Sequence, residues 1–317
     1  MSASKIALLM PGQGSQFVGM GRELAESEPQ AAEAFERAND VLGVDLRRLC
    51  WEGPEEELTR TENAQPAILL HSYAAWSCIP SEIRERVSVG AGHSLGEFSA
   101  YLAAGALIFD DALRLVRRRG ELMGRAGTIR PGTMAAVIGL DADAVREVCE
   151  GVDEGIVVPA NYNAPGQVVV SGDIEAVDAA RERALEAGAK RAVRLNVSGA
   201  FHSPLMEDAR EGLAAALEGV DVQAPSFPVV ANAAAAAVRE AESARKLLVE
   251  QLTSPVRWVE CVESMAAMAP DSWLEVGPGR VLTGLMRRID RRAVVRSVGT
   301  PGDLESLHAL LEEDDDE

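Results

Sequence analysis

The first half of the chain alternates short apolar runs with longer amphipathic stretches. The apolar runs lie at residues 6–10 and 87–91, and helix-like spacing of apolar residues is found near 18–38, 65–79 and 99–107. Short apolar runs that alternate with helical stretches are typical of buried strands in a parallel sheet. The pattern therefore predicts an α/β fold with a mostly parallel sheet.

A different order of elements begins near Gly132. The pattern predicts four strands and two helices, in the order strand 134–140, helix 141–152, strands 156–161 and 167–171, helix 173–187 and strand 190–197. This βαββαβ order is that of a ferredoxin-like unit. We therefore expect a small subdomain at 131–197, inserted into a large subdomain made of residues 1–130 and 198–317.

The last third of the chain returns to the first pattern. It predicts a strand near 228–231, helices near 236–251 and 259–268, and strands near 272–276 and 293–298. The chain ends in six consecutive acidic residues, 312–317. A block of like charges repels itself, so we expect this tail to be solvated and disordered.

Composition and charge exclude several classes of function. Hydrophobic residues make up 47% of the 317 residues, yet no apolar run approaches the ~20 residues of a membrane span. The net charge of −19 argues against nucleic acid as a partner. The four cysteines are scattered without a C-x-x-C pair, which predicts reduced thiols in a cytoplasmic protein and no metal site. A salt-rich host cytoplasm is an alternative reason for the acidic surface.

The most informative motif is Gly92-His93-Ser94-Leu95-Gly96, which joins the apolar run 87–91 to an amphipathic stretch. A strand, then G-x-S-x-G, then a helix is the order of a nucleophile elbow. This tight turn exposes the serine at a helix N-terminus, where free N–H groups favour developing negative charge. We therefore predict that Ser94 is a nucleophile.

A serine nucleophile needs a base, and the chain has only four histidines. His93 precedes Ser94 directly, and an elbow points adjacent side chains apart. His71 lies in an apolar helical stretch, where a buried structural histidine is the simpler interpretation, and His308 lies near the acidic tail. His202, in a loop after the last strand of the small subdomain, is therefore the candidate base.

Two further features suit an acyl-transfer site. The loop 11–16, Pro-Gly-Gln-Gly-Ser-Gln, follows the first strand, so one of its N–H groups can complete an oxyanion hole with the N–H of Leu95. A plain turn is the alternative interpretation of this loop. Arg119 ends an Arg-Arg-Arg run on the helix after the elbow helix. If it faces the pocket, its planar fork can hold a carboxylate.

Taken together, these residues resemble one family, the malonyl-CoA:acyl-carrier-protein transacylases, including the acyltransferase domains of polyketide synthases. The resemblance covers about residues 6–292. It rests on seven ordered motifs: PGQGSQ at 11–16, TENAQPA at 61–67, GHSLGE at 92–97, RRG at 118–120, NYNAPGQ at 161–167, GAFHSPLM at 199–206 and EVGPG at 275–279. The resemblance implies an α/β-hydrolase-like large subdomain with an inserted ferredoxin-like small one.

The resemblance also implies roles for individual residues. Ser94 would be the nucleophile, His202 the base, and Gln251 would orient His202 through a carbonyl. Gln13 and Leu95 would supply the N–H groups of the oxyanion hole. The remaining pocket residues would be Arg119, which binds the malonyl carboxylate, Gln65 and Asn163, which line the pocket, and Phe201, which crowds α-methylated substrates and so favours malonyl groups.

The implied reaction is ping-pong transfer of a malonyl group from malonyl-CoA to the phosphopantetheine thiol of an acyl carrier protein. The coenzyme A thioester is a substrate, so no tightly bound cofactor and no metal are expected, and we expect a monomer. Carrier proteins of this kind are usually acidic, so docking on an acidic chain needs a local basic patch. The candidates are Lys190, Arg191 and Arg194, or the arginines at 287, 288, 291 and 292.

Two alternatives stay open at this point. A serine esterase or thioesterase would use the same Ser94 and His202, and a degenerate domain would only dock carrier proteins. The sequence also leaves open whether the chain serves fatty-acid or polyketide synthesis.

Overall fold

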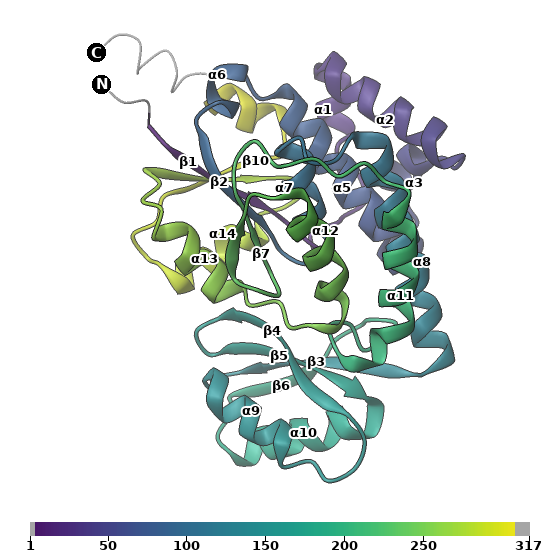
Figure 1. Ribbon diagram of the computed structural model, residues 1–317, viewed down its shortest axis with the longest axis vertical. Helices are drawn as coiled ribbons and strands as arrows, with labels where there is room; N and C mark the ends of the chain where they lie inside the picture. Colours follow the sequence, from purple (N-terminus) through teal and green to yellow (C-terminus); the bar gives the residue numbers. More distant parts are fainter. Residues whose placement is uncertain (1–3, 308–317) are drawn as a thin grey trace.

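The computed structural model describes residues 4–307, and its larger part is built on a six-stranded sheet. The strand order is β10-β9-β1-β2-β7-β8, in which all neighbours are parallel except β7 and β8 (Figure 1). The strands are β1 (Ile6–Met10), β2 (Val87–Gly92), β7 (Val229–Ala231), β8 (Ala236–Val238), β9 (Ser272–Val276) and β10 (Val295–Val298). The predicted α/β class with a mostly parallel sheet is confirmed.

Helices cover both faces of this sheet because its central strands are apolar on both sides. Ala7 and Leu9 of β1 pack with α13 (Trp258–Ala266) and α14 (Val281–Ile289). Leu8 and Met10 point the other way, into a core shared by most of the other helices. These are α1 (Arg22–Ser27), α2 (Pro29–Leu42), α3 (Leu46–Glu52), α4 (Glu55–Thr59), α5 (Thr61–Cys78), α6 (Ser81–Arg84), α7 (Gly96–Ala103), α8 (Phe109–Ile129), α11 (Glu207–Glu218) and α12 (Ala241–Glu250).

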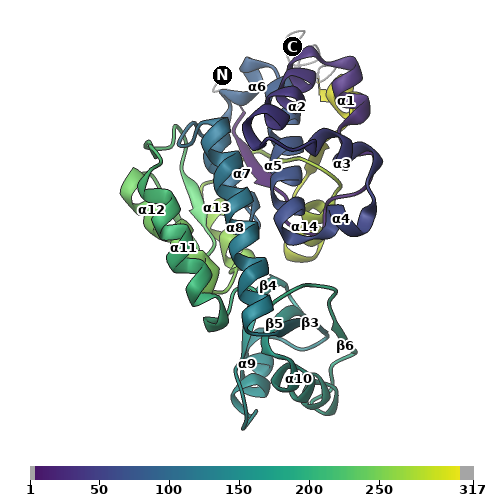
Figure 2. The same cartoon turned by 90° about the vertical axis from the view of Figure 1, so that its right-hand side faces the viewer.

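The smaller sheet is fully antiparallel, with the order β4-β5-β3-β6. Its elements are β3 (Gly132–Ile138), α9 (Ala142–Glu150), β4 (Val157–Ala164), β5 (Gln167–Asp173), α10 (Ile174–Glu186) and β6 (Arg191–Arg194). This is the predicted βαββαβ order, and all its strands lie within 131–197. The two helices pack on one face of this sheet. The long helix α8 leads from the large subdomain into the small one (Figure 2). The boundaries of the two subdomains stay predictions.

Two predicted helices differ from the structure. The helix expected at 18–38 is interrupted at Glu28, which has extended backbone angles (φ −117°, ψ 114°) because the next residue is Pro29. The helix expected at 236–251 begins only at Ala241. Residues 236–238 instead form β8, which pairs with β7, so strand pairing overrides the helix propensity of an alanine run.

Several helices were not predicted, namely α3, α4, α6, α11 and α14. None of the helices within residues 4–307 is long and apolar enough to span a lipid bilayer. His308 and the acidic tail 312–317 lie outside the described residues.

Candidate active site

Ser94 occupies a sharp turn at the carboxyl end of a central strand. Strand β2 ends at Gly92, helix α7 begins at Gly96, and Ser94 has a left-handed backbone (φ 51°). A Cβ on Gly92 would lie 1.8 Å from the carbonyl carbon of Gly96, and a Cβ on Gly96 would lie 2.1 Å from the carbonyl oxygen of Met10. Only glycine fits at either position, so the spacing of G-x-S-x-G follows directly from this backbone crowding.

The hydroxyl of Ser94 meets the imidazole of His202, which lies in the segment between β6 and α11. The distance from Ser94 Oγ to His202 Nε2 is 2.7 Å, and His202 Nδ1 lies 2.9 Å from the backbone oxygen of Gln251. A carbonyl can only accept, so Nδ1 carries the proton and Nε2 is free to accept one. Burial, with the nearby Arg119 charge, lowers the pKa of His202 to about 3. The imidazole is therefore neutral at neutral pH, as a general base must be.

Arg119 of helix α8 lies buried directly beside Ser94. Its Nη2 donates to Ser94 Oγ (3.1 Å) and Gln251 Oε1 (2.9 Å), and its Nη1 donates to Gln65 Oε1 (2.7 Å). Within residues 4–307 it forms no salt bridge, and its Nε has no partner. Burial lowers the pKa of Arg119 to about 10, so the guanidinium keeps its charge at neutral pH. A buried cation with neutral acceptors only is suited to binding an anion.

The glycine-rich loop after β1 lies against the elbow. A Cβ on Gly12 would lie 2.2 Å from the backbone oxygen of His93, so the two turns are in direct contact. Among the described residues, neither the N–H of Gln13 nor that of Leu95 has a hydrogen-bond acceptor. Both N–H groups are therefore available as donors of the kind that an oxyanion hole uses.

A cavity of about 320 Å³ opens over Ser94 and His202 and is lined from both subdomains. Its apolar wall contains Met123, Met134, Val169, Leu195 and Phe201, and its polar side includes Gln13, Gln16, Thr59, Asn161, Asn163 and Asn196. Asn163 lines it as expected, and Asn163 Oδ1 lies 2.7 Å from His93 Nε2. Gln65 does not line this cavity: it is fully buried and acts as an acceptor for Arg119.

Asn232 is a site residue that the sequence analysis missed. Its Oδ1 accepts from the backbone N–H of Ser94 (2.7 Å), and its Nδ2 donates to the backbone oxygen of Gly92 (2.8 Å). It directly follows β7, and a polar residue at the carboxyl end of a parallel strand is a sequence feature that could have identified it as a site residue. Asn232 ties the two ends of the elbow to the neighbouring strand.

Three of the basic residues proposed for docking lie on and beside β6, an edge strand of the small sheet. Lys190, Arg191 and Arg194 are exposed. Arg194 pairs with Asp178, whereas Lys190 and Arg191 form no salt bridge within residues 4–307. The residues after β6, 195–197, line the active-site cavity.

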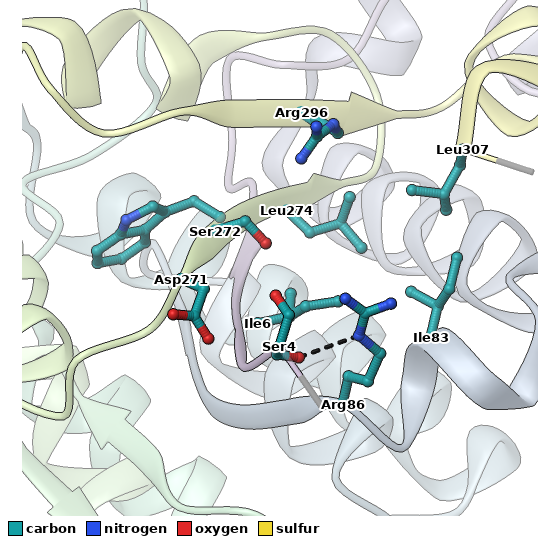
Figure 3. A pocket seen from close by; sticks show the side chains of 10 residues that line it. Ser4, Ile6, Ile83, Arg86, Asp271, Ser272, Leu274, Arg296 and Leu307 are labelled. Atoms are coloured by element: carbon teal, nitrogen blue, oxygen red, sulfur yellow. Dashed lines mark hydrogen bonds between the residues drawn. The ribbon is translucent and has the colours of Figure 1, made fainter. Parts of the chain in front are cut away.

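A second cavity, of about 260 Å³, lies at the opposite end of the large sheet. Figure 3 shows Ile6 and Ser272 at the amino ends of β1 and β9, with Arg86 donating to the backbone oxygen of Ser4. Ser94 follows the carboxyl end of β2, which runs parallel to β1. The second cavity is therefore remote from Ser94, and no predicted site residue lines it.

Comparisons with known proteins agree with this geometry. A family model described as acyl transferase domain matches residues 8–301. The malonyl CoA-acyl carrier protein transacylase of Bacillus subtilis (strain 168) is 45% identical over 315 residues, which cover 99% of each chain.

Solved structures show the same likeness. The acyl-carrier-protein-S-malonyltransferase of Bartonella henselae is 42% identical, with a TM-score of 0.94 over 97% of this chain and 99% of that one. A malonyl-transacylase in complex with a type II PKS acyl-carrier protein is 43% identical, with a TM-score of 0.90 over 96% of this chain and 98% of that one. This chain therefore belongs to the acyl transferase family, among the malonyl CoA-acyl carrier protein transacylases.

Proposed function

We propose that this protein transfers a malonyl group from malonyl-CoA to the phosphopantetheine thiol of an acyl carrier protein through a malonyl ester on Ser94. The observation that carries the proposal is the buried guanidinium of Arg119, 3.1 Å from the hydroxyl that the base His202 contacts at 2.7 Å. An acyl group on Ser94 would place its far end beside this cation. A carboxylate at that end fits the site, and a neutral acyl group leaves the cation unpaired.

The first half-reaction forms the ester. His202 Nε2 takes the proton of Ser94 as Oγ attacks the thioester carbonyl carbon. The oxyanion is held by the N–H groups of Gln13 and Leu95, and each such donor is typically worth about 10²–10³ in rate. The carbon–sulfur bond then breaks, and the coenzyme A sulfur leaves with the proton from His202.

The second half-reaction reverses these roles. The carrier thiol gives its proton to His202 while its sulfur attacks the ester carbonyl. The bond to Ser94 Oγ breaks, and the oxygen takes the proton back. Arg119 holds the malonyl carboxylate in both halves, so the acyl group is oriented throughout. Every step uses only side chains and backbone groups of this chain, so the proposed reaction involves no tightly bound cofactor and no metal.

Hydrolysis of an ester or thioester by the same Ser94–His202 pair is the less favoured function. The acceptor of His202 Nδ1 is a backbone carbonyl rather than an acidic side chain. More importantly, hydrolysis of simple esters has no use for a buried, unpaired cation beside the nucleophile.

Docking of the carrier protein is proposed at Lys190 and Arg191. Both are exposed cations on an acidic protein, and the chain runs from them into residues 195–197 of the cavity wall. A phosphopantetheine arm entering beside β6 would therefore follow the chain toward Ser94. Arg194 contributes less because Asp178 already neutralises it. We expect the enzyme to act as a monomer in the cytoplasm.

Labelling tests the proposal directly. Incubation with radiolabelled malonyl-CoA, followed by mass analysis of peptides, should place one malonyl group on Ser94. Addition of a phosphopantetheinylated carrier protein should then move the label to the carrier thiol. Ser94→Ala should take up no label. A wild-type enzyme that stays unlabelled, or that releases free malonate in preference to carrier-bound malonate, would refute the assignment.

A further inference from the structure

Glu97 is a buried acidic residue for which the reaction described above has no use. It lies in the first turn of α7, three residues after the nucleophile, and its side chain is fully buried. Its Oε2 accepts from Gln251 Nε2 (2.7 Å) and from the backbone N–H of Asn232 (2.9 Å), and its Oε1 has no partner. A buried carboxylate is costly, so its presence next to the site needs a reason.

Gln251 is the residue that Glu97 contacts most closely. Besides its backbone bond to the base, its side-chain amide bridges two charged groups. Oε1 accepts from Arg119 Nη2 (2.9 Å), while Nε2 donates to Glu97 and to the backbone oxygen of Ser94 (3.0 Å). Gln251 thus joins the cation to the elbow.

A primary amide can occupy this place in two orientations that differ by exchange of oxygen and nitrogen. In the reversed orientation, the amide oxygen would face the Glu97 carboxylate and the backbone oxygen of Ser94. The NH₂ group would then face the guanidinium of Arg119. Both contacts would be repulsive, so the carboxylate of Glu97 determines which end of Gln251 meets the cation.

We propose that Glu97 is a positioning residue that holds the Gln251 amide with its oxygen toward Arg119, and thereby keeps the guanidinium in place for a carboxylated acyl group. The inference rests on the proposed function, since it concerns selection of malonyl over neutral acyl groups. Glu97 touches neither substrate nor reacting atoms; it acts on Arg119 through the Gln251 amide and through its own negative charge, and it also accepts from the backbone N–H of Asn232. Burial raises the pKa of Glu97 to about 7, so assays at about pH 8 keep the carboxylate ionised.

The test compares acylation of Ser94 by malonyl-CoA and by acetyl-CoA in two variants. Glu97→Ala removes the acceptor, so we expect malonyl kcat/KM to fall by about 10- to 100-fold, the worth of one charge-assisted hydrogen bond. Acetyl kcat/KM should change by less than about threefold, because the acetyl group does not use Arg119. Glu97→Gln keeps an acceptor oxygen for Nε2, so it should restore most of the malonyl rate.

Glu275→Ala is the matched control. Glu275 is another fully buried glutamate, but its oxygens accept from the backbone N–H groups of Leu282 and Thr283 at the start of α14. Its loss should lower the thermal unfolding midpoint and leave the malonyl-to-acetyl ratio unchanged. If Glu97→Ala does not fold, Glu97→Asp replaces it, since the shorter side chain withdraws the acceptor from Gln251 and should give the same malonyl-specific loss.

Three results would overturn the inference. Glu97→Ala could lose kcat/KM equally for malonyl-CoA and acetyl-CoA, it could keep the wild-type malonyl kcat/KM, or Glu97→Gln could be as impaired as Glu97→Ala. Its failure is distinct from failure of the proposed function. If wild-type protein forms no malonyl ester on Ser94, the proposed function is wrong. If wild type forms it and the Glu97 variants keep the normal ratio, only the role of Glu97 is wrong.

Discussion

Replacement of Arg119 by leucine should shift the substrate preference from malonyl toward neutral acyl groups. The guanidinium has five N–H donors. Three of them bind Gln65, Gln251 and Ser94, and two have no partner among the described residues. A charge-assisted hydrogen bond contributes about 1.5–3 kcal/mol, so two such bonds make about 3–6 kcal/mol. Malonyl kcat/KM should therefore fall by about 10²- to 10⁴-fold.

The stability of this variant needs a separate measurement. Arg119→Leu leaves the side-chain oxygens of Gln65 and Gln251 without their donor, at a cost of about 1–3 kcal/mol each. Removal of a buried charge offsets part of this cost. Urea unfolding will show whether the variant is folded at the assay temperature, and only folded protein enters the kinetic comparison.

The assay is single-turnover acylation of Ser94 with malonyl-CoA and acetyl-CoA, read by mass. Arg118→Leu is the matched control, because Arg118 precedes Arg119 on the same helix and lies at the surface, 3.6 Å from Glu121. It should leave both rates unchanged. Equal slowing of acetyl and malonyl acylation by Arg119→Leu would contradict this prediction, and so would a loss of malonyl selectivity in the Arg118→Leu control.

Three further outcomes are expected. Burial and the nearby guanidinium lower the pKa of His202 to about 3, so the unfolded chain takes up this proton first as the pH falls. Between pH 7 and about pH 4, the unfolding free energy of wild type should therefore fall by about 3 kcal/mol more than that of His202→Gln, and equal pH dependence of the two proteins in urea titrations would contradict this expectation. Gly92→Ala places a Cβ 1.8 Å from the backbone of the elbow, so it should lower the free energy of unfolding by more than about 4 kcal/mol. Gly219→Ala is the control: a Cβ at Gly219 meets open space, so the unfolding midpoint should stay unchanged. Reversal of charge at Lys190 and Arg191 should slow transfer to the carrier protein and spare acylation by malonyl-CoA, and equal loss in both half-reactions would exclude this docking site.

The local features of this protein could be predicted from the order of its residues. The elbow at 92–96 could be predicted from sequence because its strand, its two glycines and its helix are neighbours along the chain. The βαββαβ order of the small subdomain likewise follows from apolar periodicity. The ends of two helices differ from the prediction. Pro29 interrupts the helical pattern at 18–38, and residues 236–238 pair with β7 instead of joining the following helix.

Only the tertiary structure decided which polar groups surround Ser94. Gln251 lies 154 residues from Glu97 and 132 residues from Arg119 in the sequence, yet one amide bridges both side chains. Gln65, expected in the pocket wall, instead lies behind Arg119. Periodicity reports which face of an element is buried, but not which distant side chain satisfies a buried donor or acceptor. That pairing is set by how the strands and helices pack, because buried polar groups must find their partners in the assembled core.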